Sequence, residues 1–335
     1  MGVGLAAAND FSLMSIAPTS RQVVYVALAG NLLVAATKAG AAFWTGSSAM
    51  FSEALHSFVD CGNEVLLLYG QHRASLRPDA EHPLGHGREL YFWSFIVALL
   101  IFAIGSGVSI YQGIAQILAP EAIRSPWINY VVLALATVFE GASWAVSVRQ
   151  FRSATARGQL SFYEAFRRSK DPPSFMVLFE DSAALLGILI AAAGTFAASQ
   201  LHMPQFDGIA SLLIGLVLGA IAIILARESK SLLIGESASG ELTSSIVDIA
   251  AQNPAVRRVN GLLTAQLAPD QILVALSLEF SDDLRVPELE ERVIEIERSI
   301  RARHSEVTAL FVKPQTPRAF SQARRDRFEG AEGDG

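Results

Sequence analysis

The sequence is poor in cysteine and in charged residues, and both shortages limit what the chain can be. Its one cysteine, Cys61, excludes a disulfide within the chain and any zinc site built from several cysteines. Charged residues make up 17% of the 335 residues, whereas about 25% is usual for a soluble domain. Long apolar runs in the first two-thirds of the chain cause this deficit. Because a membrane-spanning helix needs about 20 apolar residues, these runs exclude a purely soluble enzyme.

Positive charge and the common motifs of enzymes are scarce as well. The net charge of −6 argues against nucleic acid as a partner. The sequence has no HExxH, no Walker A loop and no G-x-S-x-G, so a protease, an ATP-driven pump and a hydrolase are poorly supported. We therefore expect a protein that is not an enzyme, that holds no tightly bound cofactor and that lies among membrane lipids.

Windows of about 19 residues predict six membrane-spanning helices. Lys and Arg gather in the connections that follow the second, fourth and sixth helices, and the positive-inside rule then places both termini in the cytoplasm. The expected helices lie near 22–45, 49–70, 90–118, 126–148, 175–199 and 206–227. The basic residues of those connections are Arg73, Arg77, Arg88, Arg149, Arg152, Arg157, Arg167, Arg168, Lys170, Arg227 and Lys230.

After Gly235 the composition changes to that of a small α+β domain, for which we expect a ferredoxin-like or metallochaperone-like fold. The expected elements are a helix over 241–252, strands over 256–266 and 272–280, a helix from Pro287 and a strand near 307–311. We divide the chain into an N-terminal cytoplasmic segment (1–20), a six-helix transmembrane domain (21–230), a cytosolic dimerisation domain (236–315) and a disordered tail (316–335).

Four ionisable residues lie on one stripe of the second helix: Glu53, His56, Asp60 and Glu64. An ionisable side chain inside a bilayer costs several kcal/mol, so it needs a partner or a function. His56 and Asp60 are four residues apart, which lets an imidazole nitrogen and a carboxylate oxygen converge on one cation. The alternative is a buried His–Asp hydrogen bond that only joins helices.

The fifth helix adds Glu180 and Asp181, two adjacent carboxylates that repel each other unless a cation or a proton neutralises one. Together the two helices suggest a divalent-metal site near the middle of the membrane. Lys38 of the first helix is the rival explanation, because it can pair with Glu140 of the fourth helix or with one of these acids. We favour a charge-balancing role for Lys38 and Glu140.

The stretch Ser52-Glu-Ala-Leu-His-Ser-Phe-Val-Asp60, followed by His82-Pro-Leu-Gly-His-Gly-Arg-Glu89, resembles the cation diffusion facilitator family of zinc transporters. The resemblance covers roughly residues 20–315. It implies a transport site with two ligands four apart on the second helix and two on the fifth. His56, Asp60 and Asp181 match three of these positions. The fourth falls on Val177, which cannot bind a metal, and Glu180 could supply the missing oxygen.

The resemblance also implies a second metal site, formed by Asp79, His82 and His86 in the loop after the second helix. The alternative is that these imidazoles only shape the loop and bind helix ends by hydrogen bonds. The family often binds more metal through several histidines of its cytosolic domain. This chain has only His304 there, so we expect that domain to act in dimerisation.

From these residues we predict a homodimeric secondary transporter that exports a divalent cation, with Zn²⁺ favoured, in exchange for protons. His56 would couple the two, because only the neutral imidazole binds metal. The alternatives are a transport-deficient regulatory partner, which Val177 favours, and a transporter of Mn²⁺, Fe²⁺ or Co²⁺. A passive channel fits less well, because several ligands slow release. We expect the bacterial inner membrane as its location.

Overall fold

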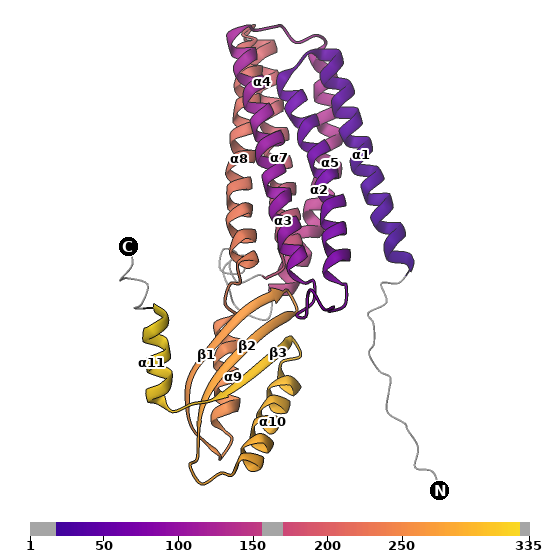
Figure 1. The fold of residues 1–335 in the computed structure, drawn as a ribbon. Helices are drawn as coiled ribbons and strands as arrows, with labels where there is room; N and C mark the ends of the chain where they lie inside the picture. Colours follow the sequence, from indigo (N-terminus) through magenta and orange to yellow (C-terminus); the bar gives the residue numbers. More distant parts are fainter. Residues whose placement is uncertain (1–17, 156–169, 329–335) are drawn as a thin grey trace.

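Six long helices run side by side, and a small α+β domain sits at one end of this bundle (Figure 1). The structure is a computed structural model that describes residues 18–155 and 170–328. Most of the segment 1–20, the end of the tail and the basic residues Arg157, Arg167 and Arg168 lie outside the described residues.

The bundle is built from six helical rods, of which the third is divided by a π-helical turn. This turn, η1, contains Gly105 and is followed directly by Gly107. The rods are α1 (Pro18–Thr45), α2 (Ser48–Ala74), α3 (Arg88–Leu100) continued by η1 (Ile101–Ser106) and α4 (Gly107–Leu118), α5 (Pro126–Thr155), α7 (Pro172–Gln200) and α8 (Gln205–Leu233).

Among the described residues, four of these rods are long and apolar enough to cross a membrane. They are Arg88–Leu118, Pro126–Arg149, Pro172–Gln200 and Gln205–Leu233. The helices α1 and α2 have a similar length, 28 and 27 residues, and pack in the same bundle. The ionisable stripe of α2 lowers its mean hydropathy, because Glu53, His56, Asp60 and Glu64 replace four apolar positions. The chain is thus an integral, multi-pass membrane protein whose third to sixth predicted spans are recovered.

Small residues allow α8 to approach α4 and η1 closely. A Cβ added at Gly215 would lie 2.9 Å from the backbone nitrogen of Ile110, and one at Gly219 would lie 2.8 Å from Ser106 Oγ. Ser211, on the same face, donates a hydrogen bond of 2.9 Å to the backbone oxygen of Ser109. The recurrence of small residues every four positions therefore serves close helix packing.

The C-terminal domain has the order helix–strand–strand–helix–strand that the sequence predicted. Strand β2 is central, antiparallel to β1 and parallel to β3. Its alternating residues Ile272, Val274, Leu276 and Leu278 are buried against the helices. The elements are α9 (Gly240–Ala251), β1 (Val256–Ala268), β2 (Gln271–Phe280), α10 (Val286–Arg303) and β3 (Val307–Pro314).

The tail that we predicted to be disordered instead begins with helix α11 (Pro317–Phe328). Phe320 packs this helix against the sheet, because its ring occupies the space that a Cβ at Gly261 of β1 would need. One aromatic side chain over a glycine thus gives this polar segment a packing partner, which composition alone did not reveal.

Candidate metal centre

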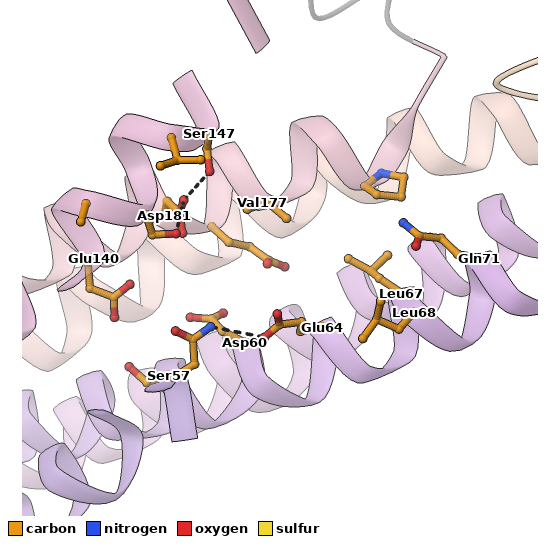
Figure 2. A pocket seen from close by; sticks show the side chains of 16 residues that line it. Ser57, Asp60, Glu64, Leu67, Leu68, Gln71, Glu140, Ser147, Val177 and Asp181 are labelled. Carbon is orange, nitrogen blue, oxygen red and sulfur yellow. Dashed lines mark hydrogen bonds between the residues drawn. The ribbon is translucent and has the colours of Figure 1, made fainter. Parts of the chain in front are cut away.

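A cavity of about 540 Å³ opens between α2, α5 and α7, and acidic side chains from all three helices line it. Figure 2 shows Asp60 and Glu64 on α2 facing Val177 and Asp181 on α7, with Glu140 of α5 beside them. Glu180 lines the cavity as well, so five carboxylates surround it. Among the described residues that line the cavity, none is Lys or Arg. Such a site attracts cations.

The pair predicted on α2 is present and has free ligand atoms. His56 Nδ1 lies 3.3 Å from Asp60 Oδ1. Within the described residues, neither His56 Nε2 nor Asp60 Oδ1 has a hydrogen-bond partner, although both atoms are buried. Burying a polar atom without a partner is costly. A cation beside Asp60 would compensate its buried oxygen. The contact between His56 and Asp60 lies within α2, so by itself it does not join two helices.

On α7 the two adjacent carboxylates turn to different neighbours. Glu180 Oε1 accepts a hydrogen bond of 3.0 Å from Asn63 Nδ2 of α2. Asp181 Oδ2 accepts hydrogen bonds from the hydroxyls of Ser143 (3.1 Å) and Ser147 (2.8 Å) of α5. Glu180 is 8% exposed and faces neither Lys38 nor solvent. Both carboxylates therefore face the cavity while being held in place by different helices.

Val177 also lines the cavity and is 39% exposed. This side chain occupies the position from which the family would supply its fourth ligand. The structure therefore places an apolar surface at that corner, with Glu180 and Asp181 one turn further along α7.

Three of the four predicted ligands, Asp60, Glu180 and Asp181, line one cavity, whereas His56 is buried beside Asp60 and does not line it. The four do not form a compact cluster. In the part of the chain that the structure describes, a search for three or more ligand atoms within 4.8 Å of one another finds Asp79, His82 and His86 but no such set among His56, Asp60, Glu180 and Asp181. The membrane residues thus surround a space larger than one coordination sphere, and closing it on a metal requires side-chain rotation or helix movement.

Lys38 and Glu140 form an ion pair, and a second acid, Glu53, shares the lysine. Lys38 Nζ lies 3.1 Å from Glu53 Oε2 and 3.4 Å from Glu140 Oε1, and it donates a hydrogen bond of 2.8 Å to Ser57 Oγ. Lys38 and Glu53 are both fully buried. The lysine therefore contacts Glu53 and Glu140, and neither Glu180 nor Asp181 is among its ion-pair partners.

The loop after α2 brings its three predicted ligands into direct contact. His86 Nε2 lies 3.1 Å from Asp79 Oδ2, His82 Nδ1 lies 3.3 Å from Asp79 Oδ1, and the two rings are 4.3 Å apart. The backbone N–H of His82 donates to Asp79 and, with further bonds from His86 and Glu81, lowers the pKa of Asp79 to about 2. The carboxylate is thus ionised at physiological pH and available to a metal.

The same loop packs closely against the C-terminal domain. A Cβ added at Gly87 would lie 2.7 Å from the Cβ of Ala268 and 3.0 Å from the backbone oxygen of Leu267, both at the end of β1. Gly85, two residues earlier, has a positive φ of 82° that favours glycine. The loop site is therefore shaped by a glycine turn and by contact with the sheet.

His304, which we expected not to belong to a metal cluster, lies between Ser245 and Glu306. Its Nε2 is 2.8 Å from Ser245 Oγ, and its Nδ1 is 3.5 Å from Glu306 Oε1. These contacts join the end of α10 to α9.

Sequence reasoning missed the residues that hold the two α7 carboxylates. Asn63 lies three residues after Asp60, on the same side of α2. Ser143 and Ser147 continue from Glu140 along α5 at spacings of three and four. Each helix thus carried a visible polar stripe in an apolar segment, and extending the stripe search from charged to neutral polar residues would have found all three.

The chain is similar to several known metal-transport proteins. The cation efflux transmembrane domain matches residues 24–234. The chain is 34% identical, over 77% of its length, to the proton-coupled zinc antiporter SLC30A9 of Xenopus laevis, and the match covers 46% of that relative. It is 30% identical, over 80% of its length, to metal tolerance protein C4 of Arabidopsis thaliana, 58% of which is covered. The manganese efflux system protein MneP of Bacillus subtilis is 24% identical over 88% of this chain and is covered to 95%.

The chain thus spans about half the length of the first two of these relatives. The match to the membrane domain includes the cavity of α2, α5 and α7 and also the loop site. The chain combines an acidic cavity inside a helical bundle, an HPxGHG loop and a C-terminal α+β domain. Together with these matches, these features show that the chain belongs to the cation diffusion facilitator family.

Proposed function

We propose that the chain is a secondary active transporter that exports a divalent metal cation from the cytoplasm in exchange for protons, with Zn²⁺ as its principal cargo. The acidic cavity between α2, α5 and α7 carries this proposal, because five carboxylates line it. His56, which does not line the cavity, contacts its Asp60 and has a buried Nε2 without a hydrogen-bond partner among the described residues. One nitrogen and several oxygens suit Zn²⁺ and also Mn²⁺, Fe²⁺ and Co²⁺. The names of the SLC30A9 relatives favour zinc and proton coupling, and that of MneP keeps manganese in the comparison.

The proposed transport ligands are His56, Asp60, Glu180 and Asp181. His56 couples metal to protons, because a protonated imidazole cannot bind a metal and a bound metal excludes the proton. The distances between the helices leave a cavity that narrows around one ion when the helices rock. Metal release to the opposite side would follow from the same movement.

The proposal extends to the assembly and its setting. We propose that the chain crosses the membrane six times and that α1 and α2, which polar residues make less apolar than the other four, are also membrane-spanning. We further propose that both termini lie in the cytoplasm. The C-terminal domain would join two copies into a homodimer. MneP is a bacterial relative and supports the bacterial inner membrane, whereas the SLC30A9 proteins are named mitochondrial.

A second candidate function is a transport-deficient, metal-binding regulatory partner. Val177 favours it, because an apolar side chain faces the cavity where the family places a ligand. One experiment separates the two functions. Purified protein in proteoliposomes is tested for Zn²⁺, Mn²⁺, Fe²⁺ and Co²⁺ flux with and without an imposed pH gradient. A regulatory partner binds metal without flux, a passive channel conducts without regard to the pH gradient, and an exchanger moves metal and protons in opposite directions.

A further inference from the structure

Lys38 holds one carboxylate that belongs to the cavity and one that does not. Its ammonium contacts Glu53 of α2 at 3.1 Å and Glu140 of α5 at 3.4 Å. Glu140 lines the cavity with Asp60 and is 17% exposed, whereas Glu53 is fully buried and absent from the lining. The two acids that neutralise the same lysine therefore differ in what else they can reach.

Glu53 is fixed in place by its surroundings. A Cβ added at Gly187 of α7 would collide with Glu53 Oε1, so this carboxylate occupies the space that the glycine leaves. Its other oxygen pairs with Lys38. Glu53 is fully buried and does not line the cavity, and its Oε1 has no hydrogen-bond partner among the described residues. Glu53 is thus the counter-ion of Lys38 that lies away from the cavity.

Glu140 has freedom that Glu53 lacks. It borders a cavity of about 540 Å³, and in Figure 2 its carboxylate lies on the side of the cavity near Ser57 and Asp60. Rotation of one long side chain can therefore transfer Glu140 from the ammonium to a cation beside Asp60.

The cavity itself has room and need for such a ligand. Val177 supplies no donor atom at one corner of the cavity, and Asp60, which lines it, has a buried Oδ1 without a hydrogen-bond partner among the described residues. His56 lies next to Asp60 and outside the cavity lining, and its Nε2 is likewise buried without a partner among those residues. A metal placed beside these atoms can take a further oxygen from α5.

We propose that Glu140 is a shared ligand, paired with Lys38 when no metal is present and bound to the metal when one enters beside Asp60. The lysine is then an internal cation that competes with the cargo for one carboxylate. Glu53 and Ser57 keep the ammonium neutralised and hydrogen-bonded after Glu140 has left. This inference rests on the proposed function, because it assumes that the cavity binds the transported metal.

The test measures whether Lys38 and Glu140 act on zinc binding together or independently. All proteins carry His82→Ala and His86→Ala, so that calorimetric Zn²⁺ titration reports the membrane site alone. Lys38→Met is combined with Glu53→Gln, because removing the lysine alone would leave a buried charge without its partner. Glu140→Gln is measured with and without that pair of changes, and monodispersity on size-exclusion chromatography establishes that each protein is folded.

We expect Glu140→Gln to weaken zinc binding about tenfold, within the range of typical couplings between sites. Removing Lys38 and Glu53 together should tighten zinc binding about tenfold when Glu140 is present and change it less than about twofold when Glu140 is Gln. Such non-additivity is the signature of two groups that interact directly. An equal tightening in both backgrounds overturns the proposal, because the lysine would then act only through its long-range field.

Glu64→Gln is the matched control, since Glu64 also lines the cavity but contacts Asn31 at 3.3 Å and not Lys38. Removing Lys38 and Glu53 together should tighten zinc binding by the same factor in the Glu64→Gln protein as in the protein that keeps Glu64. If the proteins without Lys38 fail to fold, Lys38→Arg provides the second test. A guanidinium can hold a carboxylate with two bonds. Lys38→Arg should therefore weaken zinc binding when Glu140 is present and leave zinc binding unchanged in the Glu140→Gln protein.

The same titrations separate this inference from the proposed function. If Asp60→Ala abolishes zinc binding, the membrane site is established. Additive effects of the Lys38 and Glu140 changes would then overturn only the proposal that Glu140 is a shared ligand. Absence of any zinc binding in the protein that lacks only His82 and His86 overturns both the proposed function and the shared ligand.

Discussion

The chain holds two candidate metal sites that are organised in opposite ways. The loop site takes Asp79, His82 and His86 from eight consecutive residues, and their ligand atoms lie within 4.8 Å of one another. The membrane site takes its acids from three helices and surrounds a cavity of about 540 Å³. The first is already shaped for a metal, whereas the second must close on one. This difference is expected if the loop retains its metal and the cavity releases it.

The largest effect should come from the paired residues of α2. His56→Ala or Asp60→Ala should reduce zinc flux in proteoliposomes to that of empty liposomes, because each change removes a ligand that Val177 cannot replace. Both proteins should still elute at the same volume as the unchanged protein on size-exclusion chromatography. Wild-type flux in either variant would mean that the stripe on α2 only joins helices.

A large effect should also come from Glu180, where the chain departs from the family. Glu180→Ala should weaken zinc binding about as much as Asp181→Ala, because each loss leaves the remaining charged groups desolvated and unpaired, at a cost of several kcal/mol. Val177→His should restore part of the loss in Glu180→Ala, since an imidazole there supplies the missing donor. Calorimetric titration of the single and double variants measures both effects.

The hydrogen bond from Asn63 allows a graded version of this test. Asn63→Ala removes the donor that holds Glu180 Oε1 at 3.0 Å but leaves the carboxylate. Groups that orient a ligand typically contribute about 10–100-fold to affinity. Unchanged affinity in both Asn63→Ala and Glu180→Ala would show that the site consists of His56, Asp60 and Asp181 with water.

A smaller effect on transport is expected from the loop. His82→Ala with His86→Ala should remove one zinc-binding event from the calorimetric titration and slow zinc flux without abolishing it, because these residues lie outside the cavity. The Asp79 carboxylate remains in this variant but cannot hold zinc alone. Complete loss of flux in a folded dimer would make the loop the essential site and would reverse the comparison.

The loop site was easier to predict from sequence than the cavity because its geometry is local. Asp79, His82 and His86 are near in the chain, and Gly85 forces the turn that brings them together. The α2 stripe was equally visible, since helical periodicity places His56 and Asp60 on one side. The element order of the C-terminal domain followed from the same kind of local pattern, as Ile272 to Phe280 alternate in burial.

What the sequence could not supply is contact between helices distant in the chain. Lys38 offered several acidic partners, and only packing shows that Glu53 and Glu140 share it. Gly187 gave no sign that its missing side chain makes room for Glu53, because that depends on how α7 crosses α2. Helix α11 was missed for the same reason, since the ring of Phe320 finds its place over a glycine of another strand.

The smallest effect should come from Gly87, where the loop contacts the C-terminal domain, and it should change zinc affinity at the loop site alone. Gly87→Ala adds a methyl group 2.7 Å from the Cβ of Ala268 and 3.0 Å from the backbone oxygen of Leu267, so the loop must move away from β1. Because Asp79 and His86 belong to the same loop, zinc affinity at that site should fall by a few-fold, as expected for about 1 kcal/mol of strain. The cavity lies within the bundle and shares none of these contacts.

The zinc affinity of the cavity, measured after replacement of His82 and His86, should therefore be the same with Gly or Ala at position 87. Gly40→Ala is the matched control, because a Cβ there meets nothing within 4 Å. Equal weakening of both sites by Gly87→Ala would mean that the loop and the cavity are coupled through the C-terminal domain. The two sites would then respond to metal as one system, although one is built from a single loop and the other from three helices.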